Sequence, residues 1–170
     1  MAAFLLSVHV VAAVVFVGSV TVAVSLFPRY ARLALDRTTA ATAVPVVHLL
    51  HRITGVYAVL ALAVPVFGLA VAAQLDVLGD AWVQVSMALT VLAGALLAGA
   101  VLPGQRRLLQ AVGAGSGEQL GGAAVVTARG QRVDAAALLR RLGMVSGVFN
   151  LVWVAVVVLM IVRPGSTTGV

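Results

Sequence analysis

The sequence contains no cysteine and no lysine, and it has few charged residues of either sign. Without cysteine, the chain cannot form disulfide bonds, thiolate metal sites or iron–sulfur clusters, and it has no thiol nucleophile. Charged residues make up only 9% of the 170 residues, whereas soluble domains carry about 25%. This scarcity excludes a multidomain soluble enzyme, a disordered chain and a small disulfide-rich secreted module.

Apolar sequence takes the place of charge. Hydrophobic residues account for 62% of the chain, and the mean hydropathy is +1.15. Four apolar runs can each cross a bilayer of about 30 Å, which takes about 20 helical residues. Only helices and closed barrels satisfy their backbone in lipid, and the runs lack strand-like alternation, so the sequence predicts a single all-α domain, a bundle of four transmembrane helices. The expected helices cover about 4–27, 53–73 with an extension from about 45, 82–102 and 142–162.

The net charge of +6 comes from eleven arginines that lie mostly between the apolar runs. In a soluble domain such a charge would suggest nucleic acid, but here the arginines follow the rule that cytoplasmic loops carry the positive charge, so no nucleic acid is expected. Four arginines lie in 28–52 and six in 103–141. We therefore predict a multi-pass protein of the cell membrane with both termini outside, these two loops in the cytoplasm, and anionic lipid head groups against the loops.

Proline and glycine mark the expected helix ends. The first helix is expected to stop before Pro28, and Thr42 with Pro45 is expected to begin the second. Pro65 is expected to kink the second helix inside the membrane. The glycine-rich stretch of about 104–131 is expected to form a cytoplasmic loop.

Small residues at helical spacing predict close helix contacts. Gly143 and Gly147 form a G-x-x-x-G pair in the fourth run. Four helices in one chain already need close contacts, so packing inside the bundle is favoured for this pair. A homodimer contact is the alternative, and the sequence leaves a homo-oligomer or hetero-oligomer open.

The chemistry that the sequence suggests rests on His9, about two turns into the first run. An ionisable residue at that depth marks a candidate functional site, and a neutral imidazole there can ligate haem or copper. The competing interpretation is a structural histidine that bonds a helix-neighbour carbonyl or the side chain of Gln84 or Ser86. Met87 and Met160 are expected at similar depth, so either is a candidate second ligand, although core packing is the commoner role of methionine.

A second polar cluster is expected at the opposite end of the helices. His48 and His51 are three residues apart and share a helix face, with Arg52 adjacent. His51 and Arg52 are candidates to bind a haem propionate, a quinone carbonyl or an anionic head group, because they supply several donors. An ordinary interfacial cluster is the favoured interpretation. A cofactor site requires an inward side chain beside an apolar cavity.

The residues around His9 form a longer pattern. It consists of Leu6-Ser7-Val8-His9-Val10, Phe16-Val17-Gly18 and Phe27-Pro28-Arg29. This pattern resembles the opening helix of the CopD-like and HemJ-like four-helix membrane proteins, which include copper-resistance membrane domains and a haem-dependent protoporphyrinogen oxidase. The resemblance implies a haem or metal role for His9. The chain lacks lysine and has Phe16 where tryptophan is usual, so oxidase activity itself is not expected.

A shorter pattern is His51-Arg52-Ile53-Thr54-Gly55. It resembles the histidine-arginine-x-serine/threonine-glycine motif of succinate dehydrogenase cytochrome b subunits, where the arginine and its neighbours line a quinone site. Here the motif opens the second run and not the first, and the third run has no histidine. Two functions therefore stay open. One is a membrane protein that binds b-type haem, or less favourably copper, in a redox or metal-handling role. The other is a non-catalytic accessory subunit of a larger, quinone-linked membrane complex.

Overall fold

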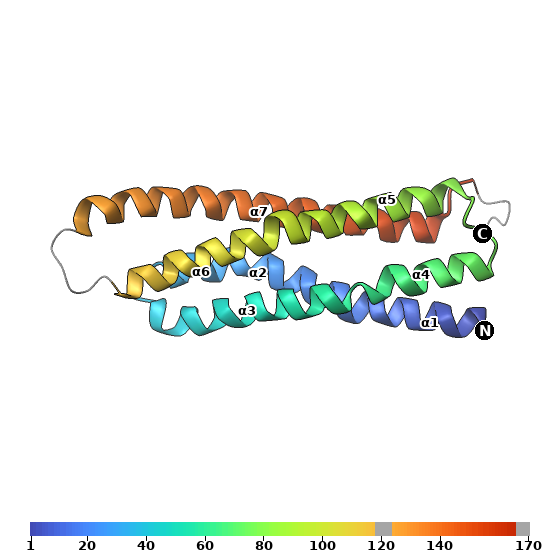
Figure 1. The fold of residues 1–170 in the computed structure, drawn as a ribbon, viewed down its shortest axis with the longest axis horizontal. Coiled ribbons are helices and arrows are strands. Elements are labelled where there is room, and N and C mark those ends of the chain that lie inside the picture. The colour runs from blue at the N-terminus through green and yellow to red at the C-terminus, as the bar shows by residue number, and fades with distance from the viewer. Residues whose placement is uncertain (118–123, 166–170) are drawn as a thin grey trace.

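The computed structural model, drawn in Figure 1, describes residues 1–117 and 124–165, and all of their side chains except those of 114–117 and 124–134. This part of the chain forms four long, apolar helical spans. The first contains α1 (Ala2–Ala12), the π-helical turn η1 (Ala13–Val17) and α2 (Gly18–Ala34), and the second contains α3 (Ala40–Leu60) and α4 (Ala63–Gln74). The third contains α5 (Ala81–Leu96), the π-helical turn η2 (Leu97–Val101) and α6 (Leu102–Gly117), and the fourth is α7 (Ala124–Val162).

The predicted all-α class with four transmembrane helices is confirmed. All four spans have the length and apolar composition needed to cross a membrane. Large apolar side chains also cover the outside of the bundle: Val14, Val91, Leu151 and Ile161 are each 69–72% exposed. A water-soluble surface does not carry so many exposed large apolar groups, whereas lipid tails accept them. The fold is that of a multi-pass membrane protein.

The spans run up and down, so that α1 begins and α7 ends at the same end of the bundle (Figure 1). The turn between α4 and α5 lies at that end, and the turn between α2 and α3 lies at the other. We call these the terminal end and the loop end. This arrangement agrees with termini on one side of the membrane, while the identity of that side stays a prediction.

The helices extend further than expected at the loop end. The first helix does not stop before Pro28 but continues to Ala34 with the proline inside it. Ala31 and Ala34 are buried in the main core, and this packing compensates for the hydrogen bond that Pro28 cannot donate. The second helix begins at Ala40 and not at Thr42.

The expected glycine-rich loop over 104–131 is also wrong in extent. The helix α6 continues to Gly117, and α7 already begins at Ala124. Glycine costs a helix about 1 kcal/mol relative to alanine, but buried leucine and valine side chains outweigh this here. Leu108 and Val112 are both buried in the main core. Residues 118–123 lie outside the described part.

The kink expected at Pro65 takes the form of a break in the second helix. A proline ring clashes with the carbonyl four residues earlier, which here belongs to Ala61, and it has no N–H to donate to that carbonyl. The helix α3 accordingly ends at Leu60, and α4 restarts at Ala63. The Ala61 carbonyl instead accepts a bond from the Val64 amide at 3.0 Å. After the break, α4 packs against α1.

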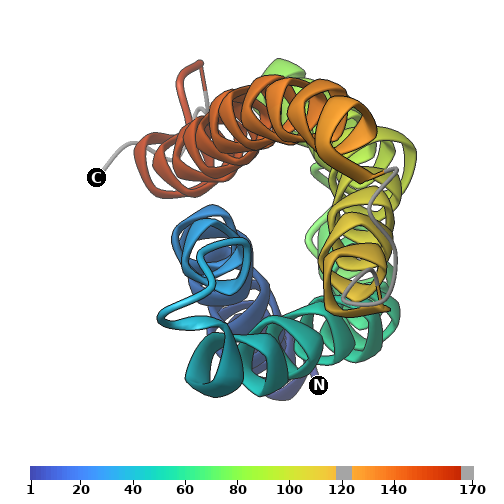
Figure 2. The same ribbon diagram turned by 90° about the vertical axis from the view of Figure 1, so that its left-hand side faces the viewer.

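The core divides along the bundle axis. At the loop end, α2, α3, α6 and α7 enclose the main core, in which Phe27 and Phe149 are the largest buried side chains. At the terminal end, α1 packs on α4 and α5 packs on α7. The end-on view in Figure 2 shows the spans arranged in a curve with the first and fourth at its two ends.

The connection between α2 and α3 is a turn organised by Asp36. Its carboxylate accepts bonds from the Thr38 hydroxyl at 2.7 Å and the Thr38 amide at 2.9 Å. Both bonds lower the pKa of Asp36 below its ordinary value, and the bond from the hydroxyl has the larger effect. Thr39 closes the turn by donating to the Leu33 carbonyl at 2.7 Å. The turn therefore favours the ionised carboxylate.

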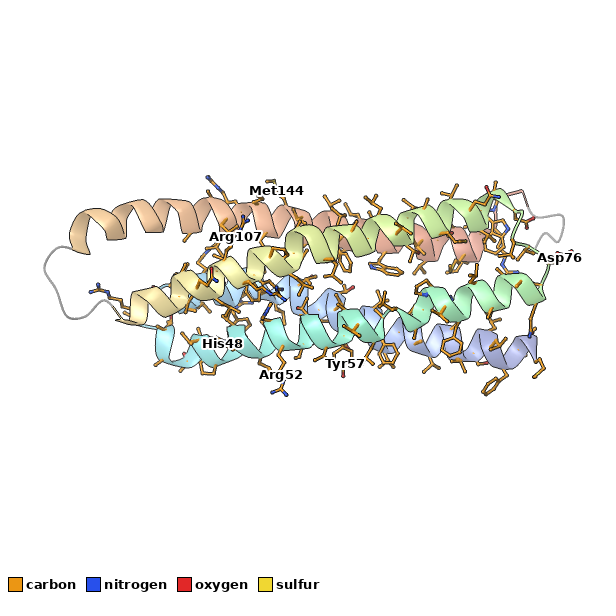
Figure 3. The ribbon with its side chains drawn as sticks, in the orientation of Figure 1. His48, Arg52, Tyr57, Asp76, Arg107 and Met144 are labelled. Carbon is orange, nitrogen blue, oxygen red and sulfur yellow. The ribbon has the colours of Figure 1, made fainter. Side chains whose placement is uncertain are left out.

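The G-x-x-x-G pair does not serve packing inside the bundle, contrary to expectation. Gly143 and Gly147 are exposed, and a Cβ atom at either position would meet no atom within 4 Å among the described residues. Their neighbour Met144 points away from the bundle in Figure 3. The close contacts within the bundle use alanines instead, including Ala23, Ala31 and Ala93.

Candidate functional site

His9 lies on α1 and is only 8% exposed. Its Nδ1 atom is 2.9 Å from the backbone carbonyl oxygen of Val64 on α4. A carbonyl oxygen only accepts, so Nδ1 carries the hydrogen and donates. In the neutral imidazole the other ring nitrogen, Nε2, then keeps a free lone pair. This is the form in which histidines that ligate haem or metal ions are commonly held, with the non-ligating N–H bonded to a carbonyl or carboxylate.

Gly68 supports the same ring from one turn further along α4. A Cβ atom at Gly68 would lie 2.9 Å from His9 Cε1 and 3.2 Å from Nδ1, closer than real side chains allow. A residue with a Cβ atom at this position would therefore force the imidazole to move. Sequence reasoning missed Gly68 and Val64. The structural interpretation expected His9 to bond either a carbonyl of its own helix or the side chain of Gln84 or Ser86. The observed partner is a carbonyl of the second span.

The two methionines proposed as second ligands occupy different surroundings. Met87 is 46% exposed on α5, next to the buried face formed by Trp82, Val83 and Ser86. Met160 is half-buried and packs against a cluster that contains Ala72, Trp82 and Val83.

The position of Met160 can be related to His9 through α4. Ala72 lies four residues after Gly68 on α4, about 6 Å along the helix axis. Gly68 supports His9, and Ala72 contacts the cluster on which Met160 packs. Met160 and His9 therefore both lie in the terminal half of the bundle.

The terminal end of the Met160 helix is anchored. The guanidinium of Arg163 lies 5.4 Å from the centre of the Trp82 ring, a cation–π distance. Trp82 Nε1 donates to Asp80 Oδ2 at 2.9 Å. These contacts hold the end of α7 against the start of α5, which keeps Met160 at a defined depth.

Several buried polar atoms have no hydrogen-bond partner in the described structure. They are Ser86 Oγ, Ser146 Oγ, Asn150 Oδ1 and Trp153 Nε1. The last three residues share one face of α7, and Asn150 Nδ2 on that face donates to Ser25 Oγ at 2.9 Å. Trp153 also packs against the cluster of Ala12, Val17 and Val64 beside His9. Trp153 Nε1 is thus an unused donor beside His9.

Replacing Ser86 by alanine tests whether its hydroxyl is truly unpaired. A buried polar atom without a partner costs about 1–3 kcal/mol, so Ser86→Ala is expected to raise the free energy of unfolding by about 1 kcal/mol. Ser25→Ala is the matched control, because its hydroxyl is bonded, and it is expected to lower that free energy by about 1 kcal/mol. Denaturant unfolding in detergent micelles measures both. Equal destabilisation by the two variants would show that Ser86 has a partner.

At the loop end, His51 points into the bundle. Its Nδ1 donates to Gln105 Oε1 at 2.8 Å, and Gln105 Nε2 donates to Thr54 Oγ1 at 3.3 Å. Thr54 Oγ1 in turn donates to the Leu50 carbonyl at 2.8 Å. Gln105 and Thr54 are completely buried. This chain of polar groups joins α3 to α6. Sequence reasoning missed Gln105, although a glutamine within a predicted membrane helix is a usable signal.

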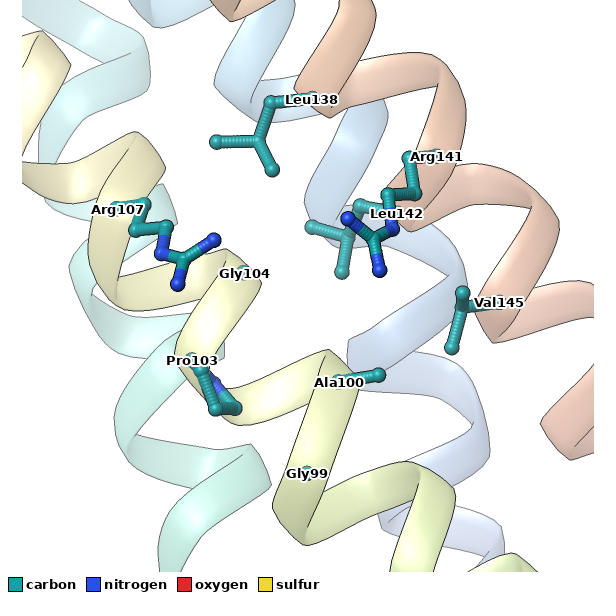
Figure 4. Close-up of a pocket in the computed structure, with 9 residues that line it drawn as sticks. All are labelled: Gly99, Ala100, Pro103, Gly104, Arg107, Leu138, Arg141, Leu142 and Val145. Carbon is teal, nitrogen blue, oxygen red and sulfur yellow. The ribbon is translucent and has the colours of Figure 1, made fainter.

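Arg52 and His48 lie on the outside of the same helix. Both side chains are exposed, and Arg52 points away from the bundle in Figure 3. The predicted cluster is therefore divided, with His51 inside and its two basic neighbours at the surface. A pocket of about 250 Å³ does occur at this end, but η2, α6 and α7 form it, and His51, Arg52 and Thr54 are not among its lining residues. It is shown in Figure 4.

Comparison of the chain with models of protein families, with curated proteins and with solved structures finds no match. The case for a function therefore rests on the geometry around His9 and on the general chemistry of its donor groups.

Proposed function

We propose that this protein is a multi-pass protein of the cell membrane that binds a b-type haem through His9, in a membrane redox role. The observation that carries the proposal is the bond from His9 Nδ1 to the Val64 carbonyl. This bond selects the tautomer with a free Nε2 lone pair and holds the ring at a fixed angle, which prepares the imidazole to ligate a metal.

His9 and a nearby methionine supply the types of donor that such a group accepts. Haem iron in electron-transfer proteins accepts histidine and methionine as axial ligands. His9 would supply the first, and Met160 is favoured over Met87 as the second because it is partly buried against a cluster at the terminal end, whereas Met87 is 46% exposed. Unpaired polar atoms such as Trp153 Nε1 are available to bond a polar group of a ligand or an ordered water. When bound, haem supplies one-electron transfer, and the apolar wall of the bundle would limit access of water.

Copper is the less favoured ligand. Soft and nitrogen ligands suit copper, and such sites usually draw several of them together. Within the described residues no group of three or more histidine, cysteine, aspartate or glutamate side chains could hold a metal ion. His9 alone, with a methionine, is a poorer copper site than a haem site.

The membrane orientation forms part of the proposal. Arginine-rich segments gather at the loop end, and we assign this end to the cytoplasm, with both termini outside. Exposed arginines such as Arg52, Arg106 and Arg140 would then face anionic lipid head groups, each contributing about 1 kcal/mol. A single cysteine introduced at Gly79, in the turn at the terminal end, is expected to react with an impermeant thiol reagent from outside. Labelling of a cysteine at Gly115 from outside would contradict this orientation.

Haem absorption tests the proposed function. Protein produced in haem-replete cells and purified in detergent is expected to show a Soret band. His9→Ala is expected to abolish the band, because no other histidine lies at this end of the bundle. His48→Ala is the control, because His48 is exposed at the loop end, and it should leave the band unchanged.

The methionine variants refine the same experiment. Met160→Leu is expected to shift the spectrum and lower the reduction potential, whereas Met87→Leu should change neither. A folded protein without a Soret band, even after titration with haemin, would contradict the proposal. It would favour the alternative, a non-catalytic accessory subunit, which predicts that His9→Gln keeps the protein folded and functional in its complex.

A further inference from the structure

The pocket between α6 and α7 has a polar side and an apolar side. Arg107 on α6 and Arg141 on α7 line it, and Figure 4 shows both guanidinium groups directed into the space between the helices. Leu138, Leu142 and Val145 of α7 form apolar parts of its wall. The pocket lies at the loop end, where the apolar spans give way to arginine-rich sequence.

The local backbone and the small side chains explain the pocket. Pro103 cannot donate a hydrogen bond within α6, and the π-helical turn η2 ends directly before α6 begins. A π-helical turn widens the helix locally, and such turns recur at functional sites. On the same wall, Ala100 has only a methyl side chain, and Gly99 has none. Missing side-chain volume therefore creates the pocket.

Among the described side chains, neither arginine has an acidic partner. No salt bridge joins Arg107 or Arg141 to a carboxylate among the side chains that the structure describes. Two guanidinium groups that converge without an acid between them repel each other, and an anion placed between them removes this cost. Guanidinium groups bind phosphate through paired N–H bonds that match its oxygens.

We propose that this pocket binds the head group of an anionic phospholipid, with its phosphate between Arg107 and Arg141. The volume of about 250 Å³ lies below the range of about 300–1,000 Å³ typical of sites that enclose whole drug-sized ligands, so it suits a head group. The acyl chains would leave the pocket along Ala100 and Val145 toward the bilayer interior. A lipid fits better than a soluble phosphate because the charged and apolar walls meet in one pocket. The inference is independent of the haem proposal.

Native mass spectrometry and thermal unfolding of the detergent-solubilised full chain test the proposal. Dioleoyl-phosphatidylglycerol is expected to remain bound and to raise the melting temperature, whereas dioleoyl-phosphatidylcholine at the same concentration should do so much more weakly. The double variant Arg107→Gln/Arg141→Gln is expected to bind phosphatidylglycerol at least about tenfold more weakly, because two charge-assisted bonds are lost. Arg32→Gln/Arg37→Gln removes the same charge from exposed positions outside the pocket and should weaken binding far less than the pocket variant does.

A second variant leaves the charge unchanged. Ala100→Leu places a larger apolar side chain on the pocket wall and is expected to weaken phosphatidylglycerol binding with the helical circular dichroism preserved. Three results would overturn the proposal. These are equal binding by the two double variants, equal stabilisation by the two lipids, and stabilisation by inorganic phosphate or glycerol 3-phosphate as large as that by phosphatidylglycerol. The last result would identify a soluble phosphate as the ligand.

Discussion

Gly68→Ala is expected to displace the imidazole of His9 and to lower the free energy of unfolding by about 1–3 kcal/mol. The added methyl group would lie 2.9 Å from His9 Cε1, so the ring must move. The ring is tied to the Val64 carbonyl at 2.9 Å, and moving it breaks that bond inside a buried site. Denaturant unfolding in micelles measures the loss, and haem binding by the same variant is expected to weaken with it.

The sign of this effect should reverse when the histidine is absent. In a His9→Ala background, Gly68→Ala meets no ring, and alanine stabilises a helix by up to about 1 kcal/mol relative to glycine. Gly94→Ala on α5 is the matched control, because an added Cβ there meets no described atom within 4 Å, and it should be neutral or stabilising. If Gly68→Ala costs the same with and without His9, the two residues do not interact as described.

Gln105→Ala is expected to be the most destabilising change at the loop end, with a loss of about 2–4 kcal/mol. The glutamine is fully buried and accepts the bond from His51 Nδ1. It also donates to Thr54, so its removal leaves His51 without its acceptor and Thr54 without this donor, and it opens a cavity between α3 and α6. Unfolding of the purified protein in denaturant measures the loss.

Gln110→Ala provides the comparison on the same helix. Gln110 is exposed, so its replacement is expected to change the free energy of unfolding by less than about 0.5 kcal/mol. A loss at Gln105 no larger than at Gln110 would mean that the polar chain does not hold α3 to α6.

The architecture was predictable because long apolar runs have few possible structures in a membrane. The length of the apolar runs predicts the four spans. Pro65, which cannot donate a hydrogen bond, predicts the irregularity in the second span. The helix ends were not predictable from local signals. Pro28 and the glycines after residue 104 are usual ends of helices, but burial of Ala31 in one case and of Leu108 in the other outweighs their local preference.

The candidate site was predictable only in part. His9 and His51 stand out because ionisable residues are rare in apolar sequence. Their partners do not stand out to the same degree. Val64 contributes a backbone carbonyl, which every residue has, and Gly68 contributes the absence of a side chain. Both contacts depend on how α4 packs against α1 after the Pro65 break, a tertiary feature that periodicity does not contain.

The protonation state of His9 tests the central claim most directly. Solid-state ¹⁵N NMR of histidine-labelled, haem-free protein in lipid distinguishes the two ring nitrogens, and the His9→Gln spectrum identifies the His9 signals. Our account predicts a protonated Nδ1, bonded to the Val64 carbonyl, and an unprotonated Nε2 that is free to ligate iron. A neutral ring with its hydrogen on Nε2 would contradict it, because Nδ1 then could not donate and no prepared ligand would exist.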